Sequence, residues 1–267
     1  SAVLIKSMYR KKTKSMRQGV SYGPELHQMA NVVQCQSTPQ RAVILVHGGA
    51  FLVGNRDLLT DWDSSVAHHM EGIVYVPDYK MKSHLSALLI VIAILALVGM
   101  LLIYCVQTVN TEDNEDALNQ SLNDVSMCIA FVKRTHPTLP IVLIGHSAGA
   151  FLTTLISLDP IYLHQVGCST ADISSSLSYS GIFSFYRLQD IYLVTHTLIR
   201  SVFLKHSHNF PLARLATLSN ADLVHIPPIL IANADFDGSL IRHSYDFAAA
   251  LYERHIPIAW KIYMDNT

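Results

Sequence analysis

The segment from Ile141 to Gly149, with the sequence IVLIGHSAG, decides the fold of this chain. An apolar run ends at Ile144, the motif G-x-S-x-G places Ser147 at its centre, and a second apolar stretch follows from Ala150. Strand, tight turn and helix form the context that this motif requires, because small residues allow a turn sharp enough to expose the serine hydroxyl. The backbone amide of Ala148 then lies at a helix N-terminus, where an oxyanion is stabilised.

A second glycine motif follows another predicted buried strand. The apolar residues 42–46 precede the sequence HGGAF, which runs from His47 to Phe51. Glycine at such a position lets the backbone approach a substrate oxygen and turn its N–H groups inward. An isolated Gly-Gly pair is most simply a turn. Two motifs that each follow a strand, in this order along the chain, instead favour nucleophilic chemistry at Ser147.

These motifs belong to a wider pattern that resembles a known family. The chain is similar to the α/β-hydrolase esterases grouped with bacterial feruloyl esterases, isoprenylcysteine methylesterases and kynurenine formamidases. The matching segments span most of the chain, at 20–24, 47–51, 76–80, 145–149, 180–183 and 227–237. The resemblance implies an α/β-hydrolase fold and the hydrolysis of an ester or an amide, and it leaves the substrate open.

The resemblance also implies a mechanism and a set of site residues. Ser147 attacks the substrate carbonyl and forms an acyl-serine intermediate. Besides Ala148, the backbone amides of Gly48, Gly49 and Ala50 are expected to form the oxyanion hole, in which one donor contributes about 3–4 kcal/mol in related chemistry. No cofactor and no metal are expected, because the cysteines and histidines show no metal-binding spacing.

The acid is expected in the segment 227–238, which reads PPILIANADFDG. In this family the acid follows the serine and precedes the histidine in the chain. Asp235 and Asp237 compete for the role. The acid of such enzymes lies about nine residues past the proline that opens its strand, and counting from Pro228 selects Asp237. Asp235 remains the alternative. If Asp237 is the acid, Asp235 is interpreted as a carboxylate at the end of the strand or in the turn.

The sequence has no histidine at the place where the resemblance implies the histidine of the triad. It should follow the last predicted strand, 256–263, but only residues 264–267 come after that strand. His255 precedes the strand, and His225 and His243 are out of order and are interpreted as surface or loop residues. We therefore expect the triad histidine beyond Thr267, and we expect the 267-residue chain to be truncated at its C-terminus and weakly active or inactive by itself.

Length and charge bound the remaining possibilities. A chain of 267 residues suits one domain with a substantial core, so we expect a single domain over residues 1–267. A net charge of −1 gives no indication of a nucleic-acid partner. The basic cluster from Lys6 to Arg17 is interpreted as a solvated lead-in, with contact to a membrane surface as the alternative.

The pattern of apolar residues predicts alternating strands and helices. Strands are expected at 42–46, 72–77, 141–145, 228–234 and 256–263, and helices at 58–70, 113–134, 148–158, 188–204 and 242–254. The helix at 113–134 is the clearest, because its apolar residues recur every three or four positions. This alternation implies a mostly parallel sheet with helices on both faces, which places sites at the carboxyl ends of the strands.

One segment does not fit this plan. Residues 85–106 contain no charged side chain, and as a helix they would extend about 33 Å, enough to cross a bilayer core. A crossing helix would put the HGGAF motif and Ser147 on opposite sides of a membrane, whereas the sheet needs both on one side. We therefore interpret the segment as an inserted apolar helix that enters one leaflet or lies beside the active site. A helix buried in protein or in an oligomer, and an insertion that ruins the fold, are the alternatives.

The sequence thus predicts a serine carboxylic-ester hydrolase that acts on a small-molecule ester and associates with a membrane through residues 85–106. An arylformamidase that uses the same residues on an N-formylkynurenine-type amide is one alternative. A hydrolase-like membrane scaffold without catalysis is another. A cytoplasmic protein is the alternative to the membrane-associated one.

Overall fold

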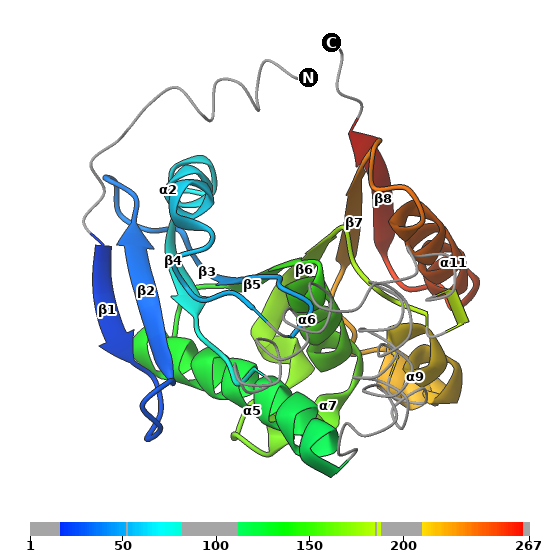
Figure 1. The fold of residues 1–267 in the computed structure, drawn as a ribbon, viewed down its shortest axis with the longest axis horizontal. Coiled ribbons are helices and arrows are strands. Elements are labelled where there is room, and N and C mark those ends of the chain that lie inside the picture. Colours follow the sequence, from blue (N-terminus) through cyan, green and yellow to red (C-terminus); the bar gives the residue numbers. More distant parts are fainter. Residues whose placement is uncertain (1–16, 52, 82–111, 185, 188–209, 264–267) are drawn as a thin grey trace, which may run out of the picture.

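The centre of the molecule is an eight-stranded sheet with the order β1-β2-β4-β3-β5-β6-β7-β8 (Figure 1). The computed structural model describes residues 17–51, 53–81, 112–184, 186–187 and 210–263. The strands are β1 (Arg17–Ser21), β2 (Met29–Gln34), β3 (Arg41–Val46), β4 (Gly72–Pro77), β5 (Ile141–His146), β6 (Ile173–Tyr179), β7 (Ile229–Ala234) and β8 (Ile258–Tyr263). β1 and β2 pair antiparallel at one edge, and the six strands from β4 to β8 in the sheet order are parallel.

Helices cover both faces of this sheet, as the alternating pattern predicts. α2 (Thr60–His69) packs on one face against β2 and β4, whereas α5 (Glu112–Thr135), α6 (Ala148–Leu158) and α11 (Leu240–Glu253) lie on the other (Figure 1). The shorter elements are α7 (Pro160–His164), the 3-10 helix η1 (Thr170–Asp172), α9 (Pro211–Thr217) and α10 (Asn220–Leu223). Parallel strands enclosed in this way are apolar on both sides.

The core follows the two-residue alternation of β3. Ile44 and Val46 face α5 and α6, whereas Val43 and Leu45 join Trp62 on the α2 side, and all four β3 side chains are fully buried. The apolar residues of α5 that predicted an amphipathic helix, namely Leu118, Leu122, Val125, Ile129 and Val132, are buried against the first of these groups. Burial of one such side chain stabilises the fold by about 1.5–3 kcal/mol.

The structure confirms the predicted strands in β3, β4, β5, β7 and β8, and the predicted helices in α2, α5, α6 and α11. The helix expected at 188–204 and the apolar segment 85–106 lie outside the described residues. Within the described part of the chain, no helix combines the length and the apolar character needed to cross a membrane.

The strands β1, β2 and β6 were not predicted. β6 has the sequence ISSSLSY, and its serines carry little strand propensity. The strand forms because it lies between β5 and β7, and the Ser178 hydroxyl pairs with Thr154 of α6 at 2.6 Å. Arg17, the last residue of the basic cluster, is exposed but is not part of an unstructured lead-in, because it begins β1 and forms an ion pair with the fully buried Asp63 at 2.5 Å.

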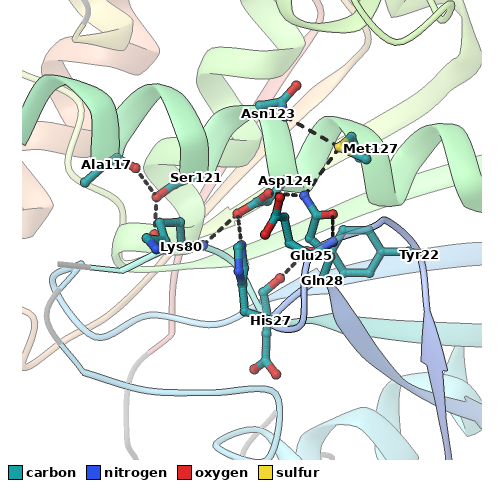
Figure 2. A network of polar contacts seen from close by, with 11 residues as sticks. Tyr22, Glu25, His27, Gln28, Lys80, Ala117, Ser121, Asn123, Asp124 and Met127 are labelled. Carbon is teal, nitrogen blue, oxygen red and sulfur yellow. Dashed lines mark hydrogen bonds and ion pairs between the residues drawn. The ribbon is translucent and has the colours of Figure 1, made fainter. Parts of the chain in front are cut away.

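A buried carboxylate on α5 joins three distant segments of the chain (Figure 2). Asp124 Oδ2 accepts from His27 Nε2 at 2.9 Å and from the backbone N–H of Lys80 at 2.8 Å, and Oδ1 accepts from Gln28 Nε2 at 2.6 Å. One turn earlier, the Ser121 hydroxyl contacts the carbonyl oxygens of Lys80 and Ala117. These contacts fix the loop between β1 and β2, and the chain after β4, on α5.

Candidate active site

Ser147 lies at the sharp turn between β5 and α6. Its backbone has φ 53° and ψ −113°, a conformation that residues other than glycine rarely adopt. The Ser147 N–H donates to the carbonyl oxygen of Tyr179 on β6 at 2.9 Å, which holds the turn in place. A Cβ on Gly149 would lie 2.2 Å from the carbonyl oxygen of Val46, so the turn can pack against β3 only with glycine there. Ser147 itself remains partly exposed.

The HGGAF loop after β3 lies in contact with this turn. A Cβ placed on Gly48 would lie 3.0 Å from Ser147 Cβ, although the two residues are far apart in the chain. Gly49, Ala50 and Phe51 have positive φ values of 128°, 53° and 63°, and the Val53 N–H closes the turn on the carbonyl oxygen of Gly49 at 3.0 Å. Such a succession of left-handed residues is costly and is found at binding and catalytic sites.

His47 holds the start of this loop. Its Nδ1 donates to the carbonyl oxygen of Gly48 at 2.7 Å, and its ring stacks on Tyr79 with 4.5 Å between the ring centroids. The Tyr79 hydroxyl donates to the carbonyl oxygen of His47 at 2.9 Å. Burial lowers the pKa of His47 below its ordinary value of 6.5 and raises the pKa of Tyr79. His47 is therefore a neutral, buried part of the loop rather than a charged group of the site.

The two candidate acids lie on the loop between β7 and α11 and have different partners. Asp237 Oδ2 accepts from the Ser180 hydroxyl at 2.7 Å, from Asn233 Nδ2 at 3.0 Å and from the backbone N–H of Ala234 at 2.9 Å. The backbone N–H of Asp235 donates to the carbonyl oxygen of Tyr263 on β8 at 3.0 Å. Both carboxylates are partly exposed.

The ring of His146, the last residue of β5, contacts two aromatic rings. Its ring centroid is 5.7 Å from that of Tyr179 and 6.3 Å from that of Trp62. Burial lowers the pKa of His146, and the negative charge of Asp237 partly opposes this effect. Ser180 and Asn233 lie in segments that the resemblance singles out, at 180–183 and 227–238, but the sequence did not predict that their side chains contact Asp237. Trp62 on α2 was not expected near the site, because it belongs to a distant helix.

The histidines do not all lie where the sequence suggested. His243, expected on the surface, is fully buried in α11, where its Nδ1 accepts from the backbone N–H groups of Phe183 and Ser184 at 3.4 and 3.3 Å. An isolated histidine on the apolar face of a helix is the signal that was missed. The triad histidine stays a prediction, because residues 264–267 lie outside the described residues and contain no histidine.

Comparison with solved structures places the chain in a known fold. Esterase B from Lactobacillus rhamnosis superposes with a TM-score of 0.69 at 14% sequence identity, over 98% of this chain and 80% of that chain. The esterase LipW from Mycobacterium marinum gives a TM-score of 0.67 at 14% identity, over 98% and 74% of the two chains. A hormone-sensitive lipase from a metagenome library gives 0.64 at 12% identity, over 99% and 80%.

No family model matches the sequence, and no curated protein matches it. At identities this low the similarity is one of fold, and the parallel sheet with helices on both faces is an α/β-hydrolase fold. The subgroup of feruloyl esterases, methylesterases and formamidases suggested by the sequence motifs is not singled out by these structures.

Proposed function

We propose that the protein is a carboxylic-ester hydrolase whose nucleophile is Ser147. The observation that carries this proposal is the contact between Gly48 and Ser147, which joins the HGGAF loop and the turn at the carboxyl ends of β3 and β5. The esterases and lipases of the same fold support it. Sheets of this kind bind their ligands at that edge.

In the proposed reaction, Ser147 Oγ attacks the carbonyl carbon of the ester as its proton passes to a general base. The carbonyl electron pair moves onto oxygen, and the backbone amides of Gly48, Gly49, Ala50 and Ala148 are proposed to stabilise the negative charge. The intermediate collapses to an acyl-serine as the alcohol leaves with the proton, and water then releases the acid by the same steps. The resemblance implies that this base is a histidine that follows the acid in the chain.

Asp237 is the proposed acid of the triad. Its position three residues past the end of β7, with three donors on one of its oxygens, supports this role over Asp235. An acid of this kind orients the imidazole and stabilises its charged form.

Labelling of the full-length protein with a fluorophosphonate tests the proposal. We expect covalent modification of Ser147 and none in Ser147→Ala, together with hydrolysis of p-nitrophenyl acetate. A folded protein that neither reacts with the probe nor hydrolyses the ester would instead be a hydrolase-like scaffold. Rates on N-formylkynurenine and on a short acyl ester, measured side by side, separate an arylformamidase from the proposed esterase.

Membrane association through residues 85–106 is the second part of the proposal. The described residues before and after the segment 82–111 lie close together, because the Ser121 hydroxyl contacts the carbonyl oxygens of both Lys80 and Ala117. A single crossing of a core about 30 Å thick would separate the two ends, so this proximity favours contact with one leaflet. Flotation with liposomes should require the apolar segment. Equal flotation of a variant with four of its leucines changed to serine would contradict this part.

A further inference from the structure

We propose that Ser180 and Asn233 are positioning residues for Asp237. They hold one oxygen of its carboxylate and leave the other as the acceptor for the imidazole of the catalytic base. This inference rests on the proposed function, in which Asp237 is the acid of the triad.

The three donors to Asp237 converge on a single oxygen atom. Ser180 Oγ, Asn233 Nδ2 and the backbone N–H of Ala234 all lie within 2.7 to 3.0 Å of Oδ2. Oδ1 has no hydrogen-bond partner among the described residues, and the side chain is partly exposed. A carboxylate held by one oxygen cannot rotate freely, so the direction in which Oδ1 points is fixed.

The donors are themselves fixed by their surroundings. Asn233 is fully buried, and its Oδ1 accepts from Trp260 Nε1 at 3.3 Å, which turns its NH₂ group toward Asp237. Ser180 is 4% exposed, and its N–H donates to the carbonyl oxygen of Ala232 on β7 at 2.9 Å. Its backbone has φ 51°, a strained conformation for serine, and this conformation accompanies the contact of its hydroxyl with Asp237. Two buried side chains therefore hold the carboxylate, one directly after β6 and one on β7.

The consequence is a role in turnover rather than in substrate binding. The acid of a triad holds the imidazole in the orientation and tautomer that accept the serine proton. If Asp237 lost its donors, the carboxylate would rotate and the imidazole would be aligned for a smaller fraction of the time. We expect kcat to fall while KM stays nearly constant.

The test compares Ser180→Gly and Ser180→Thr in the full-length protein. Glycine removes the hydroxyl and relieves the positive φ, so Tm should be retained while kcat on p-nitrophenyl acetate falls about 10-fold. Threonine keeps the hydroxyl but is β-branched at positive φ, so Tm should fall while kcat stays above that of the glycine variant. Trp260→Phe, which frees the amide of Asn233, should lower kcat by about 3-fold.

The opposite orders of Tm and kcat are the signature of a positioning role. If the glycine variant is as active as the unchanged protein and kcat falls only where Tm falls, the inference is wrong. If Asp237→Asn is impaired in the same experiment, the proposed function stands. If Ser147 is not labelled and the unchanged protein does not hydrolyse the ester, the proposed function is wrong and this inference with it.

Discussion

Two aspartates of this molecule each accept three hydrogen bonds, but they distribute them differently. Asp124 on α5 is fully buried and uses both oxygens, which are taken by His27, Gln28 and Lys80 (Figure 2). Asp237 at the end of β7 is partly exposed and receives all three bonds on Oδ2. Both oxygens of Asp124 therefore accept hydrogen bonds, whereas Oδ1 of Asp237 accepts none from the residues that the structure describes.

The difference separates a structural carboxylate from a candidate functional one. A buried carboxylate is stable only when its oxygens are satisfied, and Asp124 uses that requirement to join the loop between β1 and β2 to α5 and to the chain after β4. Asp237 is held firmly but incompletely, at the edge of the sheet where Ser147 lies. Asp124 and Asp237 accept the same number of hydrogen bonds, but the distribution of these bonds over the two oxygens indicates different roles.

The largest expected effect comes from Asp237→Asn. Loss of the negative charge removes the stabilisation and orientation of the imidazole, and we expect kcat to fall about 10⁴-fold with little change in the free energy of unfolding. Steady-state hydrolysis of p-nitrophenyl acetate by the full-length protein measures this. Asp235→Asn is the matched control and should keep kcat within about 3-fold of the unchanged protein. A larger loss in the control would reverse the assignment of the acid.

Asp124→Ala should show the opposite behaviour. Three donors lose their acceptor inside the protein, so we expect the free energy of unfolding to fall by about 3 kcal/mol. The activity of each folded molecule, counted by active-site titration, should not change. Urea unfolding measures the first quantity. The exposed Asp61 provides a control, since Asp61→Ala should cost less than about 1 kcal/mol. An Asp124 variant that is stable but inactive would remove the distinction between the two carboxylates.

Loss of one of the three donors to Asp124 should have a smaller effect than loss of the carboxylate itself. Gln28 is 3% exposed and donates to Asp124 Oδ1, so Gln28→Ala should lower the free energy of unfolding by about 1–2 kcal/mol and leave kcat unchanged. The Ser180 variants should change kcat instead. Urea midpoints and turnover measured on the same samples compare the two. A Gln28 variant that loses turnover at unchanged stability would show that the network reaches the site.

The smallest expected effect is a dependence of stability on pH that arises near Ser147. Burial lowers the pKa of both His47 and His146 below 6.5 in the folded protein. Below pH 6.5 the unfolded chain binds protons that the folded chain does not, so the free energy of unfolding should decline as the pH falls from 7 toward the folded-state pKa values. Urea unfolding at pH 7.5 and 5.5 measures the decline. It should be reduced in His47→Gln, and an equal decline in that variant would exclude His47 as a source.

The candidate nucleophile and the HGGAF loop could be identified from the sequence because their signals are local. Ser147 and Gly48 each follow an apolar run, and short-range sterics explain both motifs. The partners of Asp237 were not accessible in this way. Ser180 lies 57 residues earlier, directly after a serine-rich strand, and no local pattern relates the two. Asp124 lies inside a helix whose apolar periodicity predicts which of the neighbouring residues are buried, but does not predict the hydrogen-bond partners of a polar side chain.

The sequence by itself determined the alternation of strands and helices, the parallel sheet and the turn that carries Ser147, because propensity, periodicity and small residues act over a few neighbouring positions. The tertiary structure decided which side chains meet across the sheet. It placed Gly48 against Ser147 and, among the described residues, gave hydrogen-bond donors to both oxygens of Asp124 and to one oxygen of Asp237. Hydrogen bonds between distant segments depend on the order and register of strands, which the pattern along any single strand does not contain.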